Sequence, residues 1–353
     1  MTPAPDGRRL RVGVIGLGHW GPNLVRNFAD NPRSEIAWLC DKDHRALSTA
    51  AARYPAARAT FELDDLLADP DLDAVVVATP ISTHHAIAAA ALDAGKHVWV
   101  EKPLAVTSEE VADLIERAER GGLVLLPGHI ALYSPSVVRI KELIDAGELG
   151  DIHFISISRV NLGLHQSDAS VVWDLAPHDL SILRYWLDDL PTEVSAMARG
   201  CIFPDIPDVA FVNMRFESGT IAHLELSWLS PSKLRRTAII GSAKMVVYDD
   251  TSTEPVRIFD SGASLPDFES FGEFQLAYRT GDILSPRIDA SEPLALEVAD
   301  FCAAVLDGTP PRSSLAIGVD VVRSIEAVEE SLATGGGAVS LDSAGQPSSS
   351  ATD

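Results

Sequence analysis

Hydrophobic and polar positions alternate with two different periods along the first third of the chain. Short apolar runs, such as residues 11–16, 35–41 and 73–80, predict buried strands, and stretches with helical spacing follow them. The unbroken Val and Ala residues in 73–80 are typical of a strand that is covered on both faces. Strand–helix alternation over residues 11–127 therefore predicts an α/β domain with a doubly wound parallel sheet.

The pattern changes after residue 128. An amphipathic helix is expected at 134–150, and long strands of alternating polarity are expected at 151–163, 209–219, 220–230 and 235–250, with a hairpin turn between the second and third. A further helix is predicted at 178–190. This order of elements predicts an α+β domain built on a large mixed or antiparallel sheet.

Composition excludes several classes of function. The formal net charge of −23 has the wrong sign for binding nucleic acid, and it is compatible with a cationic substrate or simply with solubility. The chain has no apolar run long enough to span a bilayer and no apolar signal region, so we expect a cytoplasmic protein. Cys40, Cys201 and Cys302 lie far apart, which fits a reducing compartment, and the histidines lack metal-ligand spacing, so no metal site is expected.

A glycine fingerprint follows the first strand. Gly16, Gly18 and Gly21 have the G-x-G-x-x-G spacing between a strand and a helix, which is the pattern that cradles a dinucleotide pyrophosphate. Asp41 ends the second strand, twenty residues after Gly21, where an acid can bind the adenosine ribose. The alternative is a tight turn that binds nothing. Together these features predict a Rossmann dinucleotide-binding domain, with His19 and Trp20 of the same loop among the cofactor contacts.

Asp41 also bears on the choice of cofactor. A carboxylate at this position repels a 2′-phosphate, which favours NAD over NADP, although Lys42 and Arg45 could offset the repulsion. We therefore expect NAD, with Lys42 beside it. We place the dinucleotide-binding domain at 1–127, a substrate-binding and oligomerisation domain at 128–341 and a flexible polar tail at 342–353.

Candidate catalytic and cofactor-binding residues lie where strands of the first domain end. Ligands of doubly wound sheets bind beyond the carboxyl ends of the strands. The strand at 97–103 delivers Glu101 and Lys102 to that edge, where a lysine held partly out of water could exchange a proton with a substrate hydroxyl. The bond to Pro103 could be cis and so fix the direction of the lysine. From the residues alone, an exposed lysine in a turn is the simpler interpretation. Other cofactor contacts expected at this edge are Thr79, Pro80 and His84.

The segment 78–115, which contains Glu101-Lys102-Pro103 after the glycine fingerprint, resembles the central block of the glucose–fructose oxidoreductase / inositol dehydrogenase (Gfo/Idh/MocA) family. The resemblance covers roughly residues 10–335. It implies that Lys102 is catalytic. It also implies that the open face of the second sheet forms a homo-oligomer, a dimer or a tetramer.

The second half of the chain contains a D-x-x-x-H element that also resembles this family. Asp174 and His178 are four residues apart, so on a helix they share one face. His178 could act as general acid and base on the reacting hydroxyl, with Asp174 orienting it or binding a neighbouring hydroxyl. The alternative is a local Asp–His hydrogen bond that caps the helix. We expect Trp173 to contact the cofactor, and the further substrate-binding candidates are Tyr133, Arg159 and Asn161.

The surrounding residues resemble a branch of the family that acts on nucleotide-linked sugars and on sugars of antibiotic or cell-surface pathways, several members at C3. Ser170, Ile130 and Ala131 depart from the pattern of that branch. We expect NAD-dependent interconversion of a secondary hydroxyl and a ketone, with an amino sugar or aminoglycoside of antibiotic biosynthesis as the favoured substrate. A nucleotide-diphosphate sugar is the alternative. Its phosphates would need basic residues such as Arg159, Lys233, Arg235 or Arg236. An inositol dehydrogenase and an NAD-binding regulator without turnover also remain open.

Overall fold

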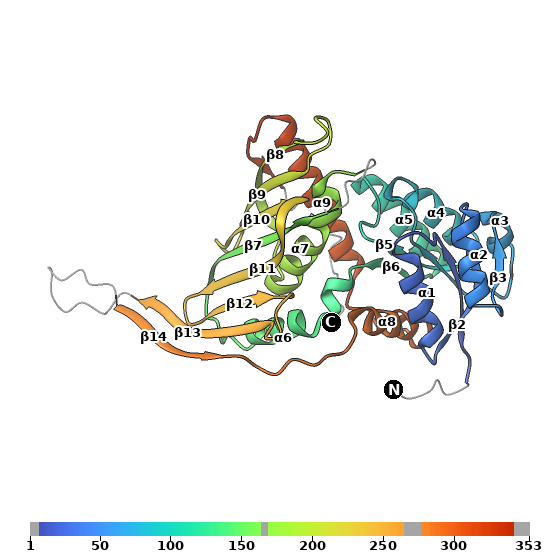
Figure 1. Ribbon diagram of the computed structural model, residues 1–353, viewed down its shortest axis with the longest axis horizontal. Helices are drawn as coiled ribbons and strands as arrows, with labels where there is room; N and C mark the ends of the chain where they lie inside the picture. The colour runs from blue at the N-terminus through green and yellow to red at the C-terminus, as the bar shows by residue number, and fades with distance from the viewer. Residues whose placement is uncertain (1–6, 164–168, 265–276, 342–353) are drawn as a thin grey trace, which may run out of the picture. The chain divides into compact units, whose positions relative to one another are not determined.

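The computed structural model describes residues 7–163, 169–264 and 277–341, and these fall into two compact units (Figure 1). The first unit comprises the chain up to Val138 together with Leu180–Tyr185 and Asp289–Arg323. The second unit comprises Arg139–Asp179, Trp186–Ile288 and the chain from Ser324 onward. The predicted tail at 342–353 lies outside the described residues.

The first unit contains a parallel sheet of six strands in the order β3-β2-β1-β4-β5-β6, as the strand–helix alternation predicts. The strands are β1 (Leu10–Ile15), β2 (Ser34–Cys40), β3 (Arg58–Thr60), β4 (Ala74–Val77), β5 (His97–Glu101) and β6 (Leu125–Gly128). The intervening helices are α1 (Gly21–Asp30), α2 (His44–Arg53), α3 (Leu63–Leu67), α4 (His84–Asp93) and α5 (Ser108–Gly121).

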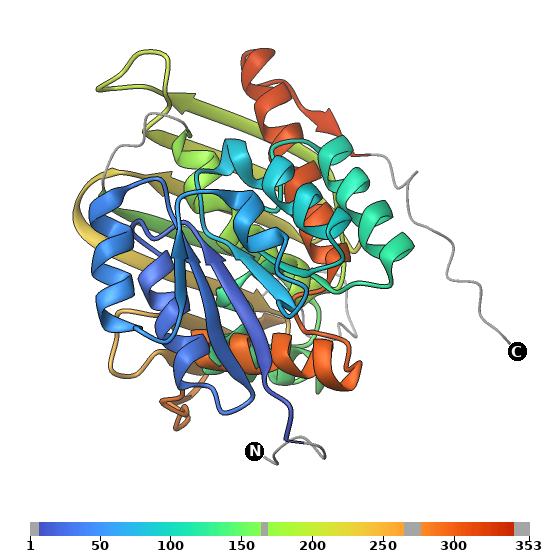
Figure 2. The ribbon, with the colours of Figure 1, turned by 90° about the vertical axis from the view of Figure 1, so that its right-hand side faces the viewer.

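Both faces of this sheet are covered (Figure 2). Along β4, Val75 and Val77 contribute to one apolar core, while Ala74 and Val76 contribute to the other. Successive strand residues point to opposite faces, so a continuous apolar run fills two cores at once. This arrangement confirms the doubly wound fold and brings the carboxyl ends of all six strands to one edge.

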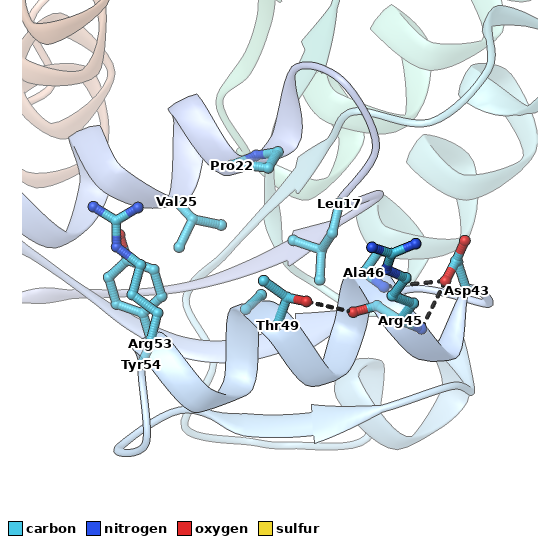
Figure 3. A pocket seen from close by; sticks show the side chains of 10 residues that line it. Leu17, Pro22, Val25, Asp43, Arg45, Ala46, Thr49, Arg53 and Tyr54 are labelled. Atoms are coloured by element: carbon cyan, nitrogen blue, oxygen red, sulfur yellow. Dashed lines mark hydrogen bonds between the residues drawn. The ribbon is translucent and has the colours of Figure 1, made fainter.

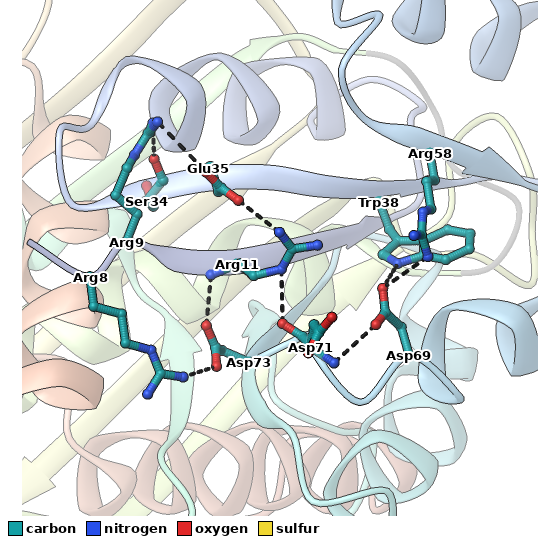
Figure 4. A network of polar contacts seen from close by, with 10 residues as sticks. All are labelled: Arg8, Arg9, Arg11, Ser34, Glu35, Trp38, Arg58, Asp69, Asp71 and Asp73. Atoms are coloured by element: carbon teal, nitrogen blue, oxygen red, sulfur yellow. Dashed lines mark hydrogen bonds and ion pairs between the residues drawn. The ribbon is translucent and has the colours of Figure 1, made fainter.

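The amino ends of these strands are held by a polar network (Figure 4). The Arg11 backbone N–H donates to Asp73 Oδ2 at 2.9 Å, and its guanidinium donates to Glu35 Oε1 at 3.0 Å. Trp38 Nε1 donates to Asp69 Oδ2 at 2.7 Å, and Arg58 stacks over the Trp38 ring at 5.3 Å. These contacts fix one end of the sheet and leave the opposite, carboxyl edge for ligands.

One helix from the far end of the chain completes the first unit. The buried face of α8 (Pro293–Asp307) contributes Leu294, Val298 and Phe301 to the core that contains Trp99 and Phe28. The Phe301 ring lies 5.7 Å from that of Trp99 and 6.1 Å from that of Phe28. The first unit is therefore discontinuous in sequence, which differs from the contiguous domain expected at 1–127. An amphipathic helix shows that it has a buried face but not which sheet that face covers.

The second unit is built on a nine-stranded sheet in the order β14-β13-β12-β11-β7-β10-β9-β8-β15 (Figure 1). Among the strand pairs that the described residues form in this second sheet, only β7–β10 is parallel, so the sheet is mixed, as expected. Its strands are β7 (Ile152–Leu162), β8 (Pro191–Arg199), β9 (Val209–Phe216), β10 (Ile221–Ser227), β11 (Leu229–Gly241), β12 (Met245–Asp249), β13 (Val256–Ser264), β14 (Ala277–Leu284) and β15 (Val339–Ser340).

Three further helices are α6 (Pro135–Asp145), α7 (Val171–Leu187) and α9 (Leu315–Ala333). Within the second unit, Trp186 of α7 packs edge-on against Tyr248 of β12, and the Ala196 amide of β8 donates to the Ser331 hydroxyl of α9. Helix α7 begins seven residues before the helix predicted at 178–190, and Pro177 lies inside it. No helix in the described part of the chain is long and apolar enough to cross a membrane.

Candidate active site

The three fingerprint glycines have three different environments. Gly16 has a φ of +91°, and a Cβ there would lie 2.5 Å from the Ala78 carbonyl oxygen. A Cβ on Gly21 would lie 2.0 Å from the Gly16 carbonyl oxygen, so the helix start packs directly on the turn. A Cβ on Gly18 would meet nothing within 4 Å. The loop is therefore tight where it turns and open where a pyrophosphate would approach.

The amino end of α1 suits an anion. Trp20 is its N-cap residue and makes no side-chain capping hydrogen bond, so the first amides of the helix are not satisfied by a cap. An uncapped helix start beside an open glycine backbone is the arrangement that binds a dinucleotide pyrophosphate. The residues that would hold NAD here are Gly18, His19 and Trp20, together with Asp41 at the end of β2 and the exposed Lys42 beside it.

Asp41 is already engaged with the fingerprint loop. Its Oδ2 accepts a hydrogen bond from the Leu17 backbone N–H, and its Oδ1 accepts one from the Asp43 backbone N–H at 2.7 Å. The Asp41 carboxylate thus links the end of β2 to the fingerprint loop. A ribose hydroxyl would donate to the same carboxylate that accepts these two backbone hydrogen bonds. Its contact with the ribose stays a prediction.

A pocket of about 320 Å³ lies between α1 and α2 (Figure 3). Leu17, Pro22 and Val25 line one side, and Arg53 and Tyr54 line part of the other. Neither Glu101 nor Lys102 lines it, so this pocket is not the place where the proposed chemistry occurs.

The ends of β4 and β5 are joined through a buried histidine. His84 is 2% exposed, and its two ring nitrogens lie 2.9 Å from the Thr79 carbonyl oxygen and 2.8 Å from the Pro103 carbonyl oxygen. Burial lowers the pKa of His84, although both carbonyls oppose the shift. A neutral ring donates to only one of them. His84 therefore positions the loop around Lys102. Its contact with the cofactor stays a prediction, because both ring nitrogens already face backbone carbonyls. Pro80 precedes the short 3₁₀ turn η1 (Ile81–Thr83) on the same edge.

Lys102 directly follows β5, and its peptide bond to Pro103 is cis. The preceding residue, Glu101, accepts a hydrogen bond from Trp20 Nε1 at 3.0 Å. Burial raises the pKa of Glu101 to about 7, while the charge of Lys102 opposes this shift. The hydrogen bond from Trp20 joins the fingerprint loop to the Glu-Lys-Pro segment. From the sequence, the two segments could be placed at the same edge of the sheet only because ligands of doubly wound folds bind there.

Tyr133, expected to bind substrate, has its hydroxyl occupied within the first unit. Tyr133 is 2% exposed and belongs to the 3₁₀ turn η2 (Ile130–Tyr133). Its hydroxyl donates to Asp300 Oδ2 at 2.7 Å and accepts from the Ser313 backbone N–H at 3.1 Å. These contacts give Tyr133 a structural role, and its contact with a substrate stays a prediction.

In the second unit, α7 carries Trp173, Asp174 and His178, all half-buried. Asp174 and His178 lie one helical turn apart, as the spacing predicts. Asp174 Oδ2 accepts a hydrogen bond from Trp228 Nε1 at 3.1 Å, so a tryptophan of the sheet orients this carboxylate. The Trp173 side chain hydrogen-bonds to Glu329 of α9. Sequence reasoning missed Trp228, because its position at the β10–β11 junction has no motif.

Arg159 and Asn161 lie on the same face of β7 as Ile155 and Ile157, since side chains alternate along a strand. The Arg159 side chain is 13% exposed and forms a two-pronged ion pair with Asp179 of α7, with Nη2 2.6 Å from Oδ1 and Nε 2.9 Å from Oδ2. Asp179 neutralises the guanidinium, so Arg159 is poorly suited to binding a phosphate. Its role in substrate binding stays a prediction. Among the described residues, no group of three or more His, Cys, Asp or Glu side chains could hold a metal ion.

A six-stranded parallel sheet with an open fingerprint loop, joined to a second domain with a mixed sheet, defines a dinucleotide-dependent oxidoreductase. A family model described as "Oxidoreductase family, NAD-binding Rossmann fold" matches residues 10–129, and one described as "GFO/IDH/MocA C-terminal domain" matches residues 137–247. The chain belongs to the Gfo/Idh/MocA family of oxidoreductases, and its first unit is an NAD-binding Rossmann domain.

Similar proteins agree with this assignment. The chain is 30% identical over 321 residues to UDP-N-acetylglucosamine 3-dehydrogenase of Acidithiobacillus ferrooxidans, covering 90% of this chain and 98% of that protein. The crystal structure of GenD2 from gentamicin A biosynthesis in complex with NAD has a TM-score of 0.82 at 28% identity, covering 97% of this chain and 99% of that chain. The match to the uncharacterized oxidoreductase YrbE of Bacillus subtilis, at 26% identity, spans 62% of this chain and 67% of that protein.

Proposed function

We propose that this protein uses NAD to interconvert a secondary hydroxyl of C3 type and a ketone on a sugar, with an amino sugar or aminoglycoside of antibiotic biosynthesis as the preferred substrate. The observation that carries the proposal is the 3.0 Å hydrogen bond from Trp20 Nε1 to Glu101 Oε1. It fixes the end of β5, and hence Lys102, beside the loop that would hold the cofactor.

In this proposal Lys102 removes the proton of the sugar hydroxyl, and His178 assists as acid and base. NAD, when bound, accepts the hydride. Asp174, oriented by Trp228, binds a neighbouring hydroxyl or orients His178. In the reverse direction the same groups return a proton to the ketone oxygen.

Two ion pairs on the second unit support an amino sugar over a nucleotide-diphosphate sugar. Of the four basic residues that could meet a diphosphate, Arg159 is paired with Asp179, and Arg235 Nη1 lies 3.2 Å from Asp250 Oδ2. Lys233 and Arg236 are exposed. The relation to GenD2 supports the same choice. The relation to UDP-N-acetylglucosamine 3-dehydrogenase supports the nucleotide-sugar alternative.

NAD reduction should be followed with three substrates in parallel: an aminoglycoside, a UDP-linked amino sugar and an inositol. Lys102→Ala should lower turnover at least about a hundredfold, the usual scale for a lost acid or base, while NAD binding persists. Lys244→Ala is the matched control, because Lys244 pairs with Glu148 at 2.8 Å on the surface of the second unit. Unchanged turnover in Lys102→Ala would remove the proposed role of the lysine. Turnover of only the UDP-linked sugar would replace the favoured substrate by its alternative.

We also infer a cytoplasmic homo-oligomer that associates through the outward face of the second sheet. The strand register places one row of large apolar residues across six neighbouring strands, and all of them are exposed or half-buried. The row consists of Ile221, Phe154, Ile240, Met245, Phe259 and Ile283. A continuous exposed apolar stripe of this kind marks a protein interface. Reducing surroundings suit the three free cysteines.

The proposed oligomer interface can be tested by light scattering after size-exclusion chromatography. Phe154→Asp should dissociate the oligomer, because it places a charge in the middle of the row. Ile202→Asp is the control, since Ile202 is 56% exposed but lies outside the row. A monomeric wild-type protein, or an equal response of both variants, would contradict this interface.

A further inference from the structure

A buried acid that the proposed reaction does not use lies on α8. Glu297 is 0% exposed, and neither carboxyl oxygen has a hydrogen-bond partner among the described residues. An ionised carboxylate in such a place loses its hydration and gains nothing in return, at a cost of several kcal/mol. Burial therefore raises the pKa of Glu297 well above its ordinary value, and the charges of Glu101 and Asp300 raise it further.

Groups from three elements interact electrostatically with this carboxyl. The charge of Glu101 on β5 raises the pKa of Glu297, burial and the charge of Glu297 raise the pKa of Tyr133 on η2, and Asp300 lies one turn further along α8. Asp300 accepts hydrogen bonds from the Tyr133 hydroxyl at 2.7 Å and from the Arg312 backbone N–H at 2.8 Å, which suits a carboxylate. Glu101 accepts one from Trp20. Glu297 is thus the acid of this cluster that no donor stabilises in its charged form.

We propose that Glu297 is a positioning residue that holds the last proton of a coupled Glu101–Glu297 pair behind Lys102. Two carboxyl groups whose charges interact strongly titrate as one system, in two steps. Because no donor in the described part of the chain stabilises the charged form of Glu297, the proton that the pair gives up last rests on Glu297. The loss of this proton places a second negative charge near Glu101, whose charge interacts with that of Lys102. Glu297 therefore acts on the lysine through Glu101.

Only the effect on turnover rests on the proposed function, and the protonation of Glu297 can be measured without it. The full-length protein, without cofactor or sugar, is examined by infrared difference spectroscopy at mildly alkaline pH. Wild type minus Glu297→Gln should show the carbonyl stretch of a protonated carboxylic acid. Glutamine keeps the shape and the neutrality of the protonated side chain, so this variant should fold. Glu119→Gln, which changes an exposed acid on α5, should show no such band. A missing band in the first difference spectrum would overturn the proposal.

The pH dependence of turnover tests the positioning role. The wild-type profile should contain an upper ionisation that is lost in Glu297→Gln, because that side chain cannot ionise. Glu297→Asp should retain the step, since it keeps a titratable group. A role in packing alone would change stability and leave the profile unmoved, and that result would refute the coupling to Lys102. If no substrate is turned over, the infrared measurement alone decides the protonation, and the failure belongs to the proposed function.

Discussion

Replacing Tyr133 with phenylalanine should destabilise the first unit by an amount that follows from two hydrogen bonds. The hydroxyl donates to Asp300 and accepts from the Ser313 backbone N–H, and Ser313 is 0% exposed. Leaving that buried N–H unpaired costs about 1–3 kcal/mol, and losing a bond to a charged carboxylate costs about 1.5–3 kcal/mol. Asp300 keeps the Arg312 amide, so we expect a total of about 2–4 kcal/mol rather than the full sum.

Urea unfolding at unchanged m-value measures this loss as a shift of the midpoint. Hydrogen exchange at the Ser313 amide adds a local measurement, because that proton loses its acceptor in the variant. Tyr54→Phe is the matched control, since Tyr54 is half-buried at the end of α2 and its hydroxyl forms no hydrogen bond with the part of the chain that the structure describes. A loss below about 0.5 kcal/mol, the range of ordinary surface changes, would refute the structural role of the hydroxyl. A raised KM without any loss of stability would instead support the predicted contact with substrate.

Other predictions follow from the glycine loop, the buried acids and the buried ion pair. Gly18→Ala should weaken NAD binding and leave the free protein as stable as the wild type. Gly21→Ala should weaken NAD binding and also destabilise the free protein, because its Cβ would lie 2.0 Å from a carbonyl oxygen. Calorimetry with and without NAD separates the effect on binding from the effect on stability. Burial raises the pKa of Glu297, so above about pH 4.5 this side chain binds more protons in the folded protein than in the unfolded chain. Its contribution to the free energy of unfolding should therefore fall as pH rises, by up to about 1.4 kcal/mol per pH unit. Glu297→Gln should lack this contribution, so its stability should fall less steeply with pH. Asp179→Asn should cost about 3–5 kcal/mol in urea unfolding, because it leaves the guanidinium of Arg159 buried without its partner, and a loss within the range of surface substitutions would contradict this reading of the pair.

Much of the Rossmann unit could be predicted from sequence because its signals are local. The fingerprint glycines, the apolar strands and the Glu-Lys-Pro segment are each written in a few consecutive residues. The contribution of α8 could not be predicted in this way, since its apolar face is compatible with either sheet. The start of α7 also differs from the predicted helix at 178–190, because the helix accommodates Pro177 in its interior.

The candidate site shows the same division. The spacing of Asp174 and His178 was sufficient to place them on one helix, but nothing local identified Trp228 as the partner of Asp174. Glu297 lies in a helix whose other residues are ordinary core and surface types, and its importance depends on neighbours more than 150 positions away. Arg159 was recognised as a basic residue at a strand, and only the tertiary contact with Asp179 shows that its charge is already compensated.

The place of α8 in the chain has a consequence for biosynthesis. Phe301 and Val298 fill the core around Trp99, yet the ribosome adds them about two hundred residues after that tryptophan. A nascent chain that contains only the first six strands exposes this apolar surface until β7 to β14 have also been synthesised. The nucleotide-binding unit, although it begins first, should therefore reach its native state only after α8 has left the ribosome.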